Sequence, residues 1–355
     1  MKTALIEKYQ NEPISYKEAL DLFEKADFLD LAQIAKKIKL SKTGNKVYFT
    51  INKHINYTNI CSSKCLMCAF YRNEGDKDAY TMSFEQVEKE LSGIENLKEV
   101  HIVGALNPKL DFSYYIKLLE TVKKAAPSAN IKAFTAAEID FFSKISSLSH
   151  TEVLEQLKKA GLQTMPGGGA EVFSERVRKK LYPKKIGFEE WAYIHELAHS
   201  MGIKSNATLL FGHIETKEEI IDHLFKLRQL QEKTKGFLCF VPLLFHPENT
   251  LFEGNIQKKS AIEQLRVLAI SRIILDNFEH IKAYWVMMSD SISQVGLHFG
   301  ADDIDGTIEK ENIFHAAGAK SASGLVSEKI IEMVKNAGFV PVLRDALYNE
   351  IKVYE

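Results

Sequence analysis

Three cysteines lie within eight residues of one another, as Cys61, Cys65 and Cys68 in the segment C-S-S-K-C-L-M-C. Soft thiolates at this x3-x2 spacing suit three corners of an iron–sulfur cluster, whereas a structural zinc site usually takes four ligands in two separated pairs. The one other cysteine, Cys239, lies far along the chain in an apolar run. The fourth iron would then have no protein ligand, and an open iron is a place where a small molecule can bind and react.

Two other interpretations of the cysteines stay open at this point. His54 or His101 could complete a zinc shell, which would make the chain a structural zinc or binding module. The thiols could also be free, as they are in many intracellular proteins.

The segment H-E-L-A-H at 195–199 matches a helical zinc motif. Because Trp191 and Ile194 indicate a helix on the outside of a sheet, we expect no active site there.

Composition narrows the class of protein. Of 355 residues, 45% are hydrophobic and 26% charged, which are ordinary globular values, and the formal net charge is −1. A chain so close to neutral has no global field that attracts nucleic acid or an anionic membrane. The longest apolar stretch, 236–245, is too short to cross a bilayer, and the first residues lack the pattern of a signal peptide. We expect a cytoplasmic protein with no nucleic-acid or membrane partner.

Strand-like and helical patterns alternate along most of the chain. Residues 14–40 first predict two helices. The predicted strands are 47–55, 99–105, 130–136, 162–167, 204–211, 236–245, 281–288 and, less regularly, 302–308. The predicted helices between them are 83–97, 111–125, 137–160, 174–201, 216–233, 259–278 and 290–299. Eight strands with helical connections predict an α/β fold of the (β/α)8 TIM-barrel type. We expect an N-terminal helical extension at 1–45, a barrel at 46–320 and a C-terminal segment at 321–355 packed on it.

Polar and glycine-rich segments follow several of the predicted strands, where a barrel carries its active site. They are 103–108, 135–138, 165–171, 211–216 and 246–249. Gly104 and Gly168 lack a Cβ, so a ligand can approach their backbone closely. Glu171 can accept hydrogen bonds from a ribose diol, or it can simply stabilise the start of the following helix. The convergence of these segments with the cysteine loop predicts one ligand-binding mouth.

The pattern C-x3-C-x2-C after a first barrel strand resembles the radical S-adenosylmethionine superfamily. That resemblance implies a [4Fe–4S] cluster on Cys61, Cys65 and Cys68, whose open iron chelates S-adenosylmethionine and generates a 5′-deoxyadenosyl radical. It also implies contacts to S-adenosylmethionine from Met67, Tyr71, Gly104, Ala105, Glu138, Gly168 and Glu171. Two of these depart from the superfamily pattern, since Met67 replaces a common aromatic residue and Ala105 replaces a glycine.

Longer segments resemble a narrower group, the radical enzymes of the futalosine route to menaquinone and their deazaflavin-ring synthase relatives. The resemblance rests on H-I-N-Y-T-N-I-C at 54–61, C-A-F-Y-R at 68–72 and P-G-G-G-A-E at 166–171. Four further stretches, at 204–216, 240–250, 281–285 and 300–307, are similar to members that add the adenosyl radical to 3-[(1-carboxyvinyl)oxy]benzoate. The alternatives within the group are cyclic dehypoxanthine futalosine synthases and deazaflavin-ring synthases.

The resemblance implies a transferase that forms a C–C bond and uses S-adenosylmethionine as a co-substrate. It also implies a reducing electron donor such as flavodoxin or ferredoxin. The small aromatic substrate carries two carboxylates, so hydrogen-bond donors should converge on it. The side chains expected to position it are Asn206, His213 and His246, with Asn107, Arg72 and Tyr71 as further candidates.

Overall fold

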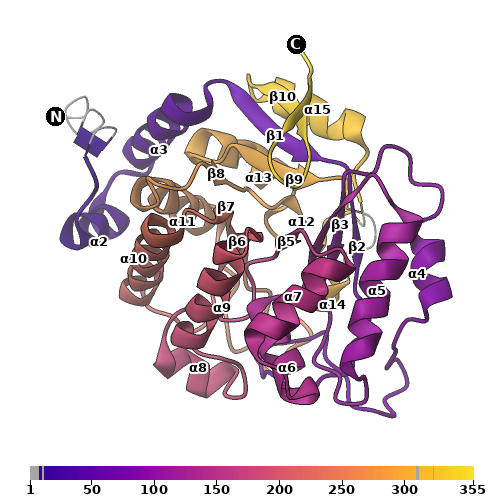
Figure 1. Cartoon of the computed structure of the whole chain (residues 1–355). Helices are drawn as coiled ribbons and strands as arrows, with labels where there is room; N and C mark the ends of the chain where they lie inside the picture. Colours follow the sequence, from indigo (N-terminus) through magenta and orange to yellow (C-terminus); the bar gives the residue numbers. More distant parts are fainter. Residues whose placement is uncertain (1–7, 10–11, 309–311, 323) are drawn as a thin grey trace.

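The computed structural model describes residues 8–9, 12–308, 312–322 and 324–355 (Figure 1). Its centre is a curled sheet of seven parallel strands in sequence order, from β2 to β8. The strands are β2 (Asn52–Ile55), β3 (Glu99–Ile102), β4 (Asn130–Ala133), β5 (Thr164–Met165), β6 (Lys204–Phe211), β7 (Phe237–Leu244) and β8 (His280–Ile281). Parallel neighbours need crossover connections, and helices supply them on the outer face of the curled sheet.

The crossover helices begin at strong caps. The helices are α4 (Phe84–Leu91), α5 (Phe112–Ala125), α6 (Ala136–Ser146), α7 (His150–Ala160), α8 (Glu175–Leu181), α9 (Phe188–Ser200), α10 (Lys217–Thr234) and α11 (Ala261–Ile274). Capping boxes, in which a Ser or Thr side chain and a Glu or Gln three residues later cap each other's backbone, start α4, α6, α7, α10 and α11. The single helix expected at 137–160 is divided because Ser147 takes the left-handed conformation and Ser149 caps a new helix. The helix expected at 174–201 is also divided, since α8 ends before Pro183 and α9 begins after Gly187.

A second sheet closes the gap between β8 and β2. Its order is β11-β10-β1-β9, with β1 (Lys46–Thr50) and β9 (Asp303–Gly306) parallel. Lys282, just after β8, forms an isolated parallel bridge with Asp303. The predicted eighth strand at 302–308 therefore exists as β9, and the predicted TIM-type fold is confirmed.

The strand predicted at 281–288 is mostly wrong. After β8 the backbone N–H of Ala283 still donates to the Asp303 carbonyl, but Trp285–Met288 form a short helix, α12. The N–H groups of Met287 and Met288 donate to the Tyr284 carbonyl. β9 is only four residues long, so it offers no continuing ladder and the chain turns into a helix instead.

The two ends of the described chain flank the barrel. The predicted lead-in helices are α2 (Tyr16–Lys25) and α3 (Phe28–Thr43), and α3 packs its buried face against α11. At the other end come α13 (Asp290–Gly296), a 3-10 turn η1 (Leu297–Phe299), α14 (Ile313–Ala316), α15 (Ser327–Asn336), β10 (Val340–Arg344) and β11 (Glu350–Val353). β10 pairs with β1, so the C-terminal segment extends the closing sheet. The domain boundaries at 45/46 and 320/321 stay predictions.

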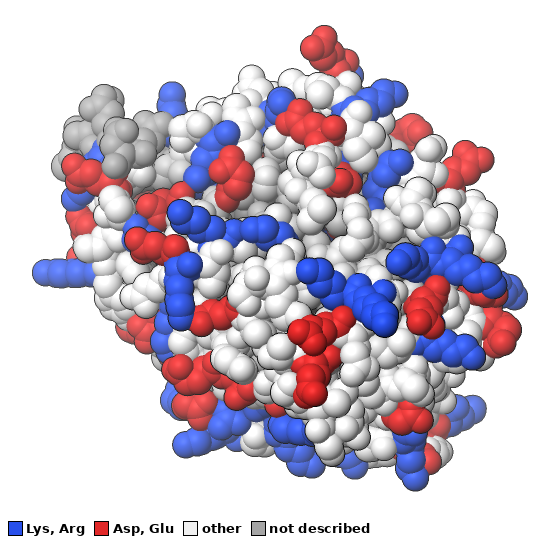
Figure 2. Space-filling view, in the orientation of Figure 1, with Lys and Arg blue, Asp and Glu red and all other residues white. Residues whose placement is uncertain are grey.

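The surface carries charges of both signs. Figure 2 shows Lys and Arg interspersed with Asp and Glu over the visible face, without a large patch of one sign. Among the described residues, no helix has the length and apolar character needed to cross a bilayer.

Candidate functional site

The cysteine loop leaves the C-terminal end of β2 and is fastened at several points. The backbone N–H of Arg72 donates to the Asn59 carbonyl at 2.7 Å, and the Cys61 N–H donates to the Arg72 carbonyl at 3.1 Å. The N–H of Leu66 donates to the Leu181 carbonyl at 2.8 Å, which ties the loop to the end of α8. The loop therefore presents its cysteines in a fixed position at the barrel mouth.

The three cysteines line a cavity that we call the outer cavity, with an empty volume of about 1190 Å³ including its open mouth. The sequence-predicted residues that line it are Cys61, Cys65, Met67, Cys68, Tyr71, Gly104, Ala105, Glu138, Gly168, Glu171 and His246. These side chains come from loops after β2, β3, β4, β5 and β7. The structure thus brings eleven of the thirteen predicted site residues to one cavity, at the strand ends where a barrel places its site.

The cysteines fit an iron–sulfur cluster better than a zinc ion. In a tetrahedral zinc site with Zn–S bonds of about 2.3 Å, the sulfur atoms lie about 3.8 Å apart. Among the described residues, the three cysteine sulfurs do not form a group within 4.8 Å of one another. Cys65 is buried, and burial raises the pKa of its thiol to about 11. Three thiols on the wall of an open cavity fit a cluster with one exposed corner.

Glu138 organises the wall beside the cysteines. Its Oε1 accepts a hydrogen bond from the Tyr57 hydroxyl at 2.7 Å and from the Gly104 N–H at 3.1 Å. Its Oε2 accepts from the N–H and the hydroxyl of Thr135, at 2.7 and 2.8 Å, as the capping box of α6. Burial raises the pKa of this carboxyl. Glu138 therefore fixes the backbone of Gly104 in place at the wall of the outer cavity.

Glu171 forms a partly exposed ion pair with a lysine that the sequence did not single out. Lys185 Nζ lies 2.5 Å from Glu171 Oε1, at the rim of the outer cavity. Burial would lower the pKa of Lys185, but the neighbouring Glu171 outweighs burial and raises it. The ammonium group also lies close enough to Cys65 and Cys68 to affect their thiols. The site thus holds a permanent cation beside the cysteines, which favours bound anionic groups.

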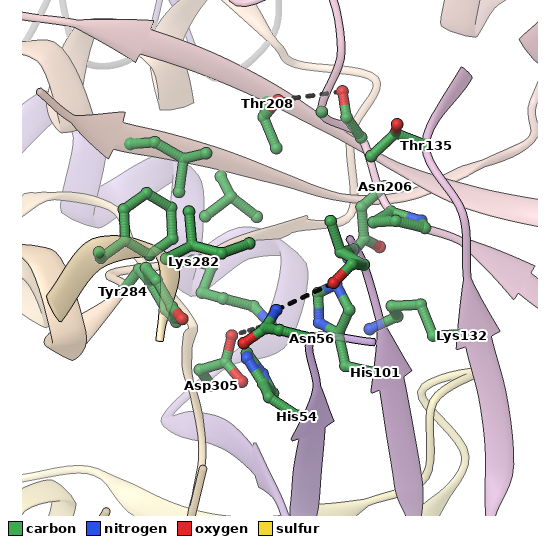
Figure 3. Close-up of a pocket in the computed structure, with 18 residues that line it drawn as sticks. His54, Asn56, His101, Lys132, Thr135, Asn206, Thr208, Lys282, Tyr284 and Asp305 are labelled. Carbon is green, nitrogen blue, oxygen red and sulfur yellow. Dashed lines mark hydrogen bonds and ion pairs between the residues drawn. The ribbon is translucent and has the colours of Figure 1, made fainter. Parts of the chain in front are cut away.

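A second cavity, which we call the inner cavity and whose lining Figure 3 shows, adjoins the outer one. The two share their walls at Val103, Thr135, Gly168, Leu243, Ile313 and Phe314. Polar and charged side chains line the part that is not shared, and they include His54, Asn56, His101, Lys132, Asn206, Lys282 and Asp305. Its empty volume is about 770 Å³, a figure that includes its open mouth.

Strand register explains why these side chains meet. His54 on β2 pairs with His101 on β3, which pairs with Lys132 on β4, so all three point to the same face. The rings of the two histidines lie 4.6 Å apart, and burial lowers the pKa of His101 well below its ordinary value. Sequence reasoning missed this cavity. The sequence does contain a signal for it. Side chains along a barrel strand alternate between the inside and the outside, so a histidine or lysine within a short strand can point into the barrel.

The two lysines that line the inner cavity, Lys132 and Lys282, are each paired with a carboxylate. Lys132 Nζ donates to Glu99 Oε2 at 2.6 Å, and this lysine lowers the pKa of Glu99 to about 2 although burial acts to raise it. Lys282 Nζ donates to Asp305 Oδ2 at 2.8 Å and lies 3.6 Å from Asp303 Oδ1. Burial lowers the pKa of Lys132 despite its pairing with Glu99, whereas Asp303 and Asp305 outweigh burial and raise the pKa of Lys282.

His246 lines the outer cavity next to α12. Its Nε2 lies 3.1 Å from the Met287 carbonyl, and its Nδ1 lies 3.1 Å from Lys258 Nζ. Burial and then Lys258 lower its pKa, so the ring is neutral at pH 7. A neutral ring with Lys258 behind it is oriented but cannot supply a fixed charge.

Three residues expected at the substrate do not line either cavity. His213 is a correction, because its ring folds back onto its own loop, with Nε2 3.0 Å from the Leu210 carbonyl and Nδ1 2.8 Å from Glu215. Arg72 clamps the cysteine loop through Asp78 and the carbonyls of Ala69 and Tyr71. Asn107 donates to the hydroxyls of Thr58 and Thr81. All three order loops instead of facing the cavities.

The H-E-L-A-H segment is not a zinc site. His195 and His199 both contact the hydroxyl of Ser205, at 2.8 and 2.7 Å. Glu196 points the other way and pairs with Lys233 at 2.7 Å. The segment lies on α9, and the expectation that it carries no active site agrees with these contacts.

Comparisons with known proteins agree with this geometry. The family model described as "Radical SAM superfamily" matches residues 55–227, and the model described as "CofH/MqnC C-terminal region" matches residues 234–355. The chain is 41% identical to an aminodeoxyfutalosine synthase of Thermus thermophilus, covering 98% of this chain and 94% of that protein. It is 37% identical to a 5-amino-6-(D-ribitylamino)uracil–L-tyrosine 4-hydroxyphenyl transferase of Methanopyrus kandleri, covering 95% of this chain and 93% of that protein.

Solved structures support the fold. Methylornithine synthase superposes with a TM-score of 0.73 at 15% identity, over 95% of this chain and 97% of that one. Enzymes of the radical S-adenosylmethionine superfamily use a [4Fe–4S] cluster and S-adenosylmethionine, and the cysteine wall of the outer cavity fits such a cluster. The chain belongs to the radical S-adenosylmethionine superfamily, in the family of enzymes that carry the CofH/MqnC C-terminal region.

Proposed function

We propose that the chain is an aminofutalosine synthase, which joins the 5′-deoxyadenosyl group of S-adenosylmethionine to 3-[(1-carboxyvinyl)oxy]benzoate. The products are aminofutalosine and methionine, with loss of one substrate carboxylate. The observation that carries the proposal is the joined pair of cavities, because the reaction needs two substrates in contact. The outer cavity has the cysteines, and the inner cavity shares its wall at Val103, Leu243 and Phe314. The similarity to the Thermus thermophilus enzyme supports the choice of substrates.

The bound cluster and S-adenosylmethionine would supply a 5′-deoxyadenosyl radical, and the remaining work falls to the residues of this chain. Cys61, Cys65 and Cys68 would hold the cluster. The fixed backbone at Gly104 and the ion pair of Glu171 with Lys185 would bind the polar groups of S-adenosylmethionine. The other outer-cavity contacts proposed for it are Met67, Tyr71, Ala105, Glu138 and Gly168.

Placement and exclusion of water are the main catalytic tasks of such a site. Holding two reacting atoms about 3–3.5 Å apart replaces a bimolecular encounter by a reaction within one complex. The shared walls are mostly apolar, with Val103, Leu243, Ile313 and Phe314 between the two cavities. Apolar walls exclude water from the reacting centre. His246 and Asn206 are proposed to orient the substrate from the two sides of this junction.

We also propose that a small reducing protein, such as a flavodoxin or ferredoxin, supplies electrons to the cluster, and that the enzyme is cytoplasmic. The four cysteines are all free thiols in the structure, as expected in a reducing compartment.

A second candidate is the reaction of the methanogen relatives, named as transfer of a 4-hydroxyphenyl group to a ribitylaminouracil. The 37% identity over nearly the whole chain keeps it as a rival. The two reactions treat the adenosyl group differently. Aminofutalosine synthesis incorporates it into the product, whereas hydrogen abstraction from tyrosine releases it as 5′-deoxyadenosine.

One pair of incubations tests the proposal. The reconstituted enzyme is incubated without oxygen with S-adenosylmethionine and a reductant, either with 3-[(1-carboxyvinyl)oxy]benzoate or with tyrosine and the ribitylaminouracil. Mass spectrometry should find the mass of aminofutalosine in the first mixture only. Free 5′-deoxyadenosine with a hydroxyphenyl adduct in the second mixture, and no adenosylated product in the first, would refute the proposal in favour of its rival.

A further inference from the structure

Two lysines that line the inner cavity have hydrogen-bond donors beyond those that their carboxylate partners use. An ammonium group has three donors. Among the described residues, Lys132 uses one in its hydrogen bond to Glu99, and Lys282 uses one in its hydrogen bond to Asp305. Each lysine therefore keeps donors for a ligand while its charge is held in place by its carboxylate partner.

Asn206 adds a second, independent sign of a missing ligand. It is 7% exposed, lies in the middle of the sheet on β6 and lines the inner cavity (Figure 3). Its side-chain amide makes no hydrogen bond to any residue in the described part of the chain, unlike the neighbouring Thr208, whose hydroxyl donates to the Gly167 carbonyl. Because this amide lines the inner cavity and has no protein partner among the described residues, its donors and acceptor are available to a ligand held there.

The opposite part of the inner cavity is apolar and aromatic. Tyr284 and Phe314 meet edge to face with ring centroids 5.8 Å apart, and Val241 and Leu243 line the same space. A flat ring would pack well against such walls. The cavity is therefore amphipathic, with apolar walls next to the outer cavity and cationic donors at its inner end.

We propose that the inner cavity is the binding site for the ring carboxylate of an aromatic acid. Lys132, Lys282 and Asn206 would donate to the carboxylate at the inner end, and the ring would lie against Tyr284 and Phe314. This orientation directs the other end of the substrate toward the outer cavity and the cysteines. The assignment of that other end to a carboxyvinyl ether rests on the proposed function, whereas the anion site itself rests on the cavity.

The test compares an acid with its neutral amide. The reconstituted holoenzyme, kept free of oxygen, is titrated calorimetrically with 3-methoxybenzoate and with 3-methoxybenzamide. Charge-assisted hydrogen bonds are about twice as strong as neutral ones, so the acid should bind at least about tenfold more tightly than the amide. Equal affinity for the two probes in the wild-type enzyme would overturn the proposal without recourse to any variant.

Asn206→Asp is the sharpest variant, because Asp has the shape of Asn but replaces the amide donors by acceptors and a negative charge. We expect the acid-to-amide preference to fall at least about tenfold, while amide binding changes little. Asn255→Asp, the same change on an exposed loop, is the matched control and should keep the wild-type preference. An unchanged preference in Asn206→Asp overturns the proposal.

The same experiments separate this proposal from the proposed function. If Asn206→Asp loses the acid preference but the wild-type enzyme makes no aminofutalosine, the anion site stands and the assigned reaction falls. If the wild-type enzyme makes aminofutalosine and Asn206→Asp binds both probes as the wild type does, the reaction stands and the anion site falls.

Discussion

Gly104 tests how tightly the wall of the outer cavity is built. A Cβ placed on Gly104 would lie 2.5 Å from Cζ, 2.6 Å from Cε1 and 2.8 Å from Cε2 of the Tyr57 ring, well inside ordinary contact. Tyr57 is fully buried and its hydroxyl donates to Glu138, so the ring cannot move without losing that hydrogen bond. Gly104 does not have a positive φ, and so the effect of a substitution is steric and not a matter of backbone conformation.

Gly104→Ala should therefore destabilise the protein strongly. Overpacking a well-filled site costs about 1–3 kcal/mol. Displacing the Tyr57 hydroxyl from a buried carboxyl adds about 1–2 kcal/mol. The expected loss in the free energy of unfolding is about 3 kcal/mol, measured by urea titration followed by circular dichroism. Gly168→Ala is the matched control, because the nearest atom to its Cβ is a methyl group of Thr135 at an ordinary 3.4 Å.

A double-mutant cycle identifies the cause. Tyr57→Leu removes the ring that the new Cβ would meet, so in that background Gly104→Ala should cost less than about 1 kcal/mol. The coupling free energy between the two sites should then be about 2 kcal/mol. The reasoning is refuted if Gly104→Ala costs the same in both backgrounds, or if it leaves the unfolding free energy of the wild-type protein within about 0.5 kcal/mol.

Three further predictions follow from buried groups. Cys61→Ser should yield protein with little bound iron and sulfide after anaerobic reconstitution. The control Cys239→Ser, a change in the buried strand β7, should bind iron and sulfide as the wild type does. Equal iron contents in the two variants would contradict the assigned ligands. His223 is neutral in the fold because burial lowers its pKa to about 3, so its contribution to stability is complete above pH 6.5 and is lost as the pH falls from 6.5 toward 3. Between pH 6.5 and 5, His223→Gln should thus lose about 2 kcal/mol less unfolding free energy than the wild type, and parallel pH curves would show that this histidine is not responsible. His195→Gln should leave the zinc content of the purified protein unchanged by elemental analysis, since His195 and His199 bind Ser205 and not a metal; a fall in zinc would revive the helical zinc motif.

The sequence predicted the architecture well where the local alternation of strand and helix patterns determines it. The alternation of strand and helix patterns predicts all the strand positions of the barrel, although only the start of 281–288 is a strand, and the strand order places the cysteine loop at the barrel mouth. The segments after the strands were expected to converge, and Gly104, Glu138, Gly168 and Glu171 do line one cavity. What local patterns could not give was the split of two long helices and the short helix α12, which depend on caps and on the short β9.

The errors in the site come from side-chain contacts that the strand and helix pattern does not predict. His213 follows a strand and so was expected at the mouth, but Glu215 and the Leu210 carbonyl hold its ring in its own loop. Lys132 and Lys282 were overlooked because a lysine in a strand usually faces solvent. Both are buried because Glu99 on the neighbouring strand β3 pairs with Lys132 and Asp305 on β9 pairs with Lys282.

Electron paramagnetic resonance of the reduced protein tests the central claim most directly, that Cys61, Cys65 and Cys68 hold a cluster whose open iron faces the outer cavity. The anaerobically reconstituted and reduced enzyme should show a [4Fe–4S] signal that changes when S-adenosylmethionine is added. A protein that binds zinc without iron or sulfide, or a cluster signal that S-adenosylmethionine leaves unchanged, would contradict the account.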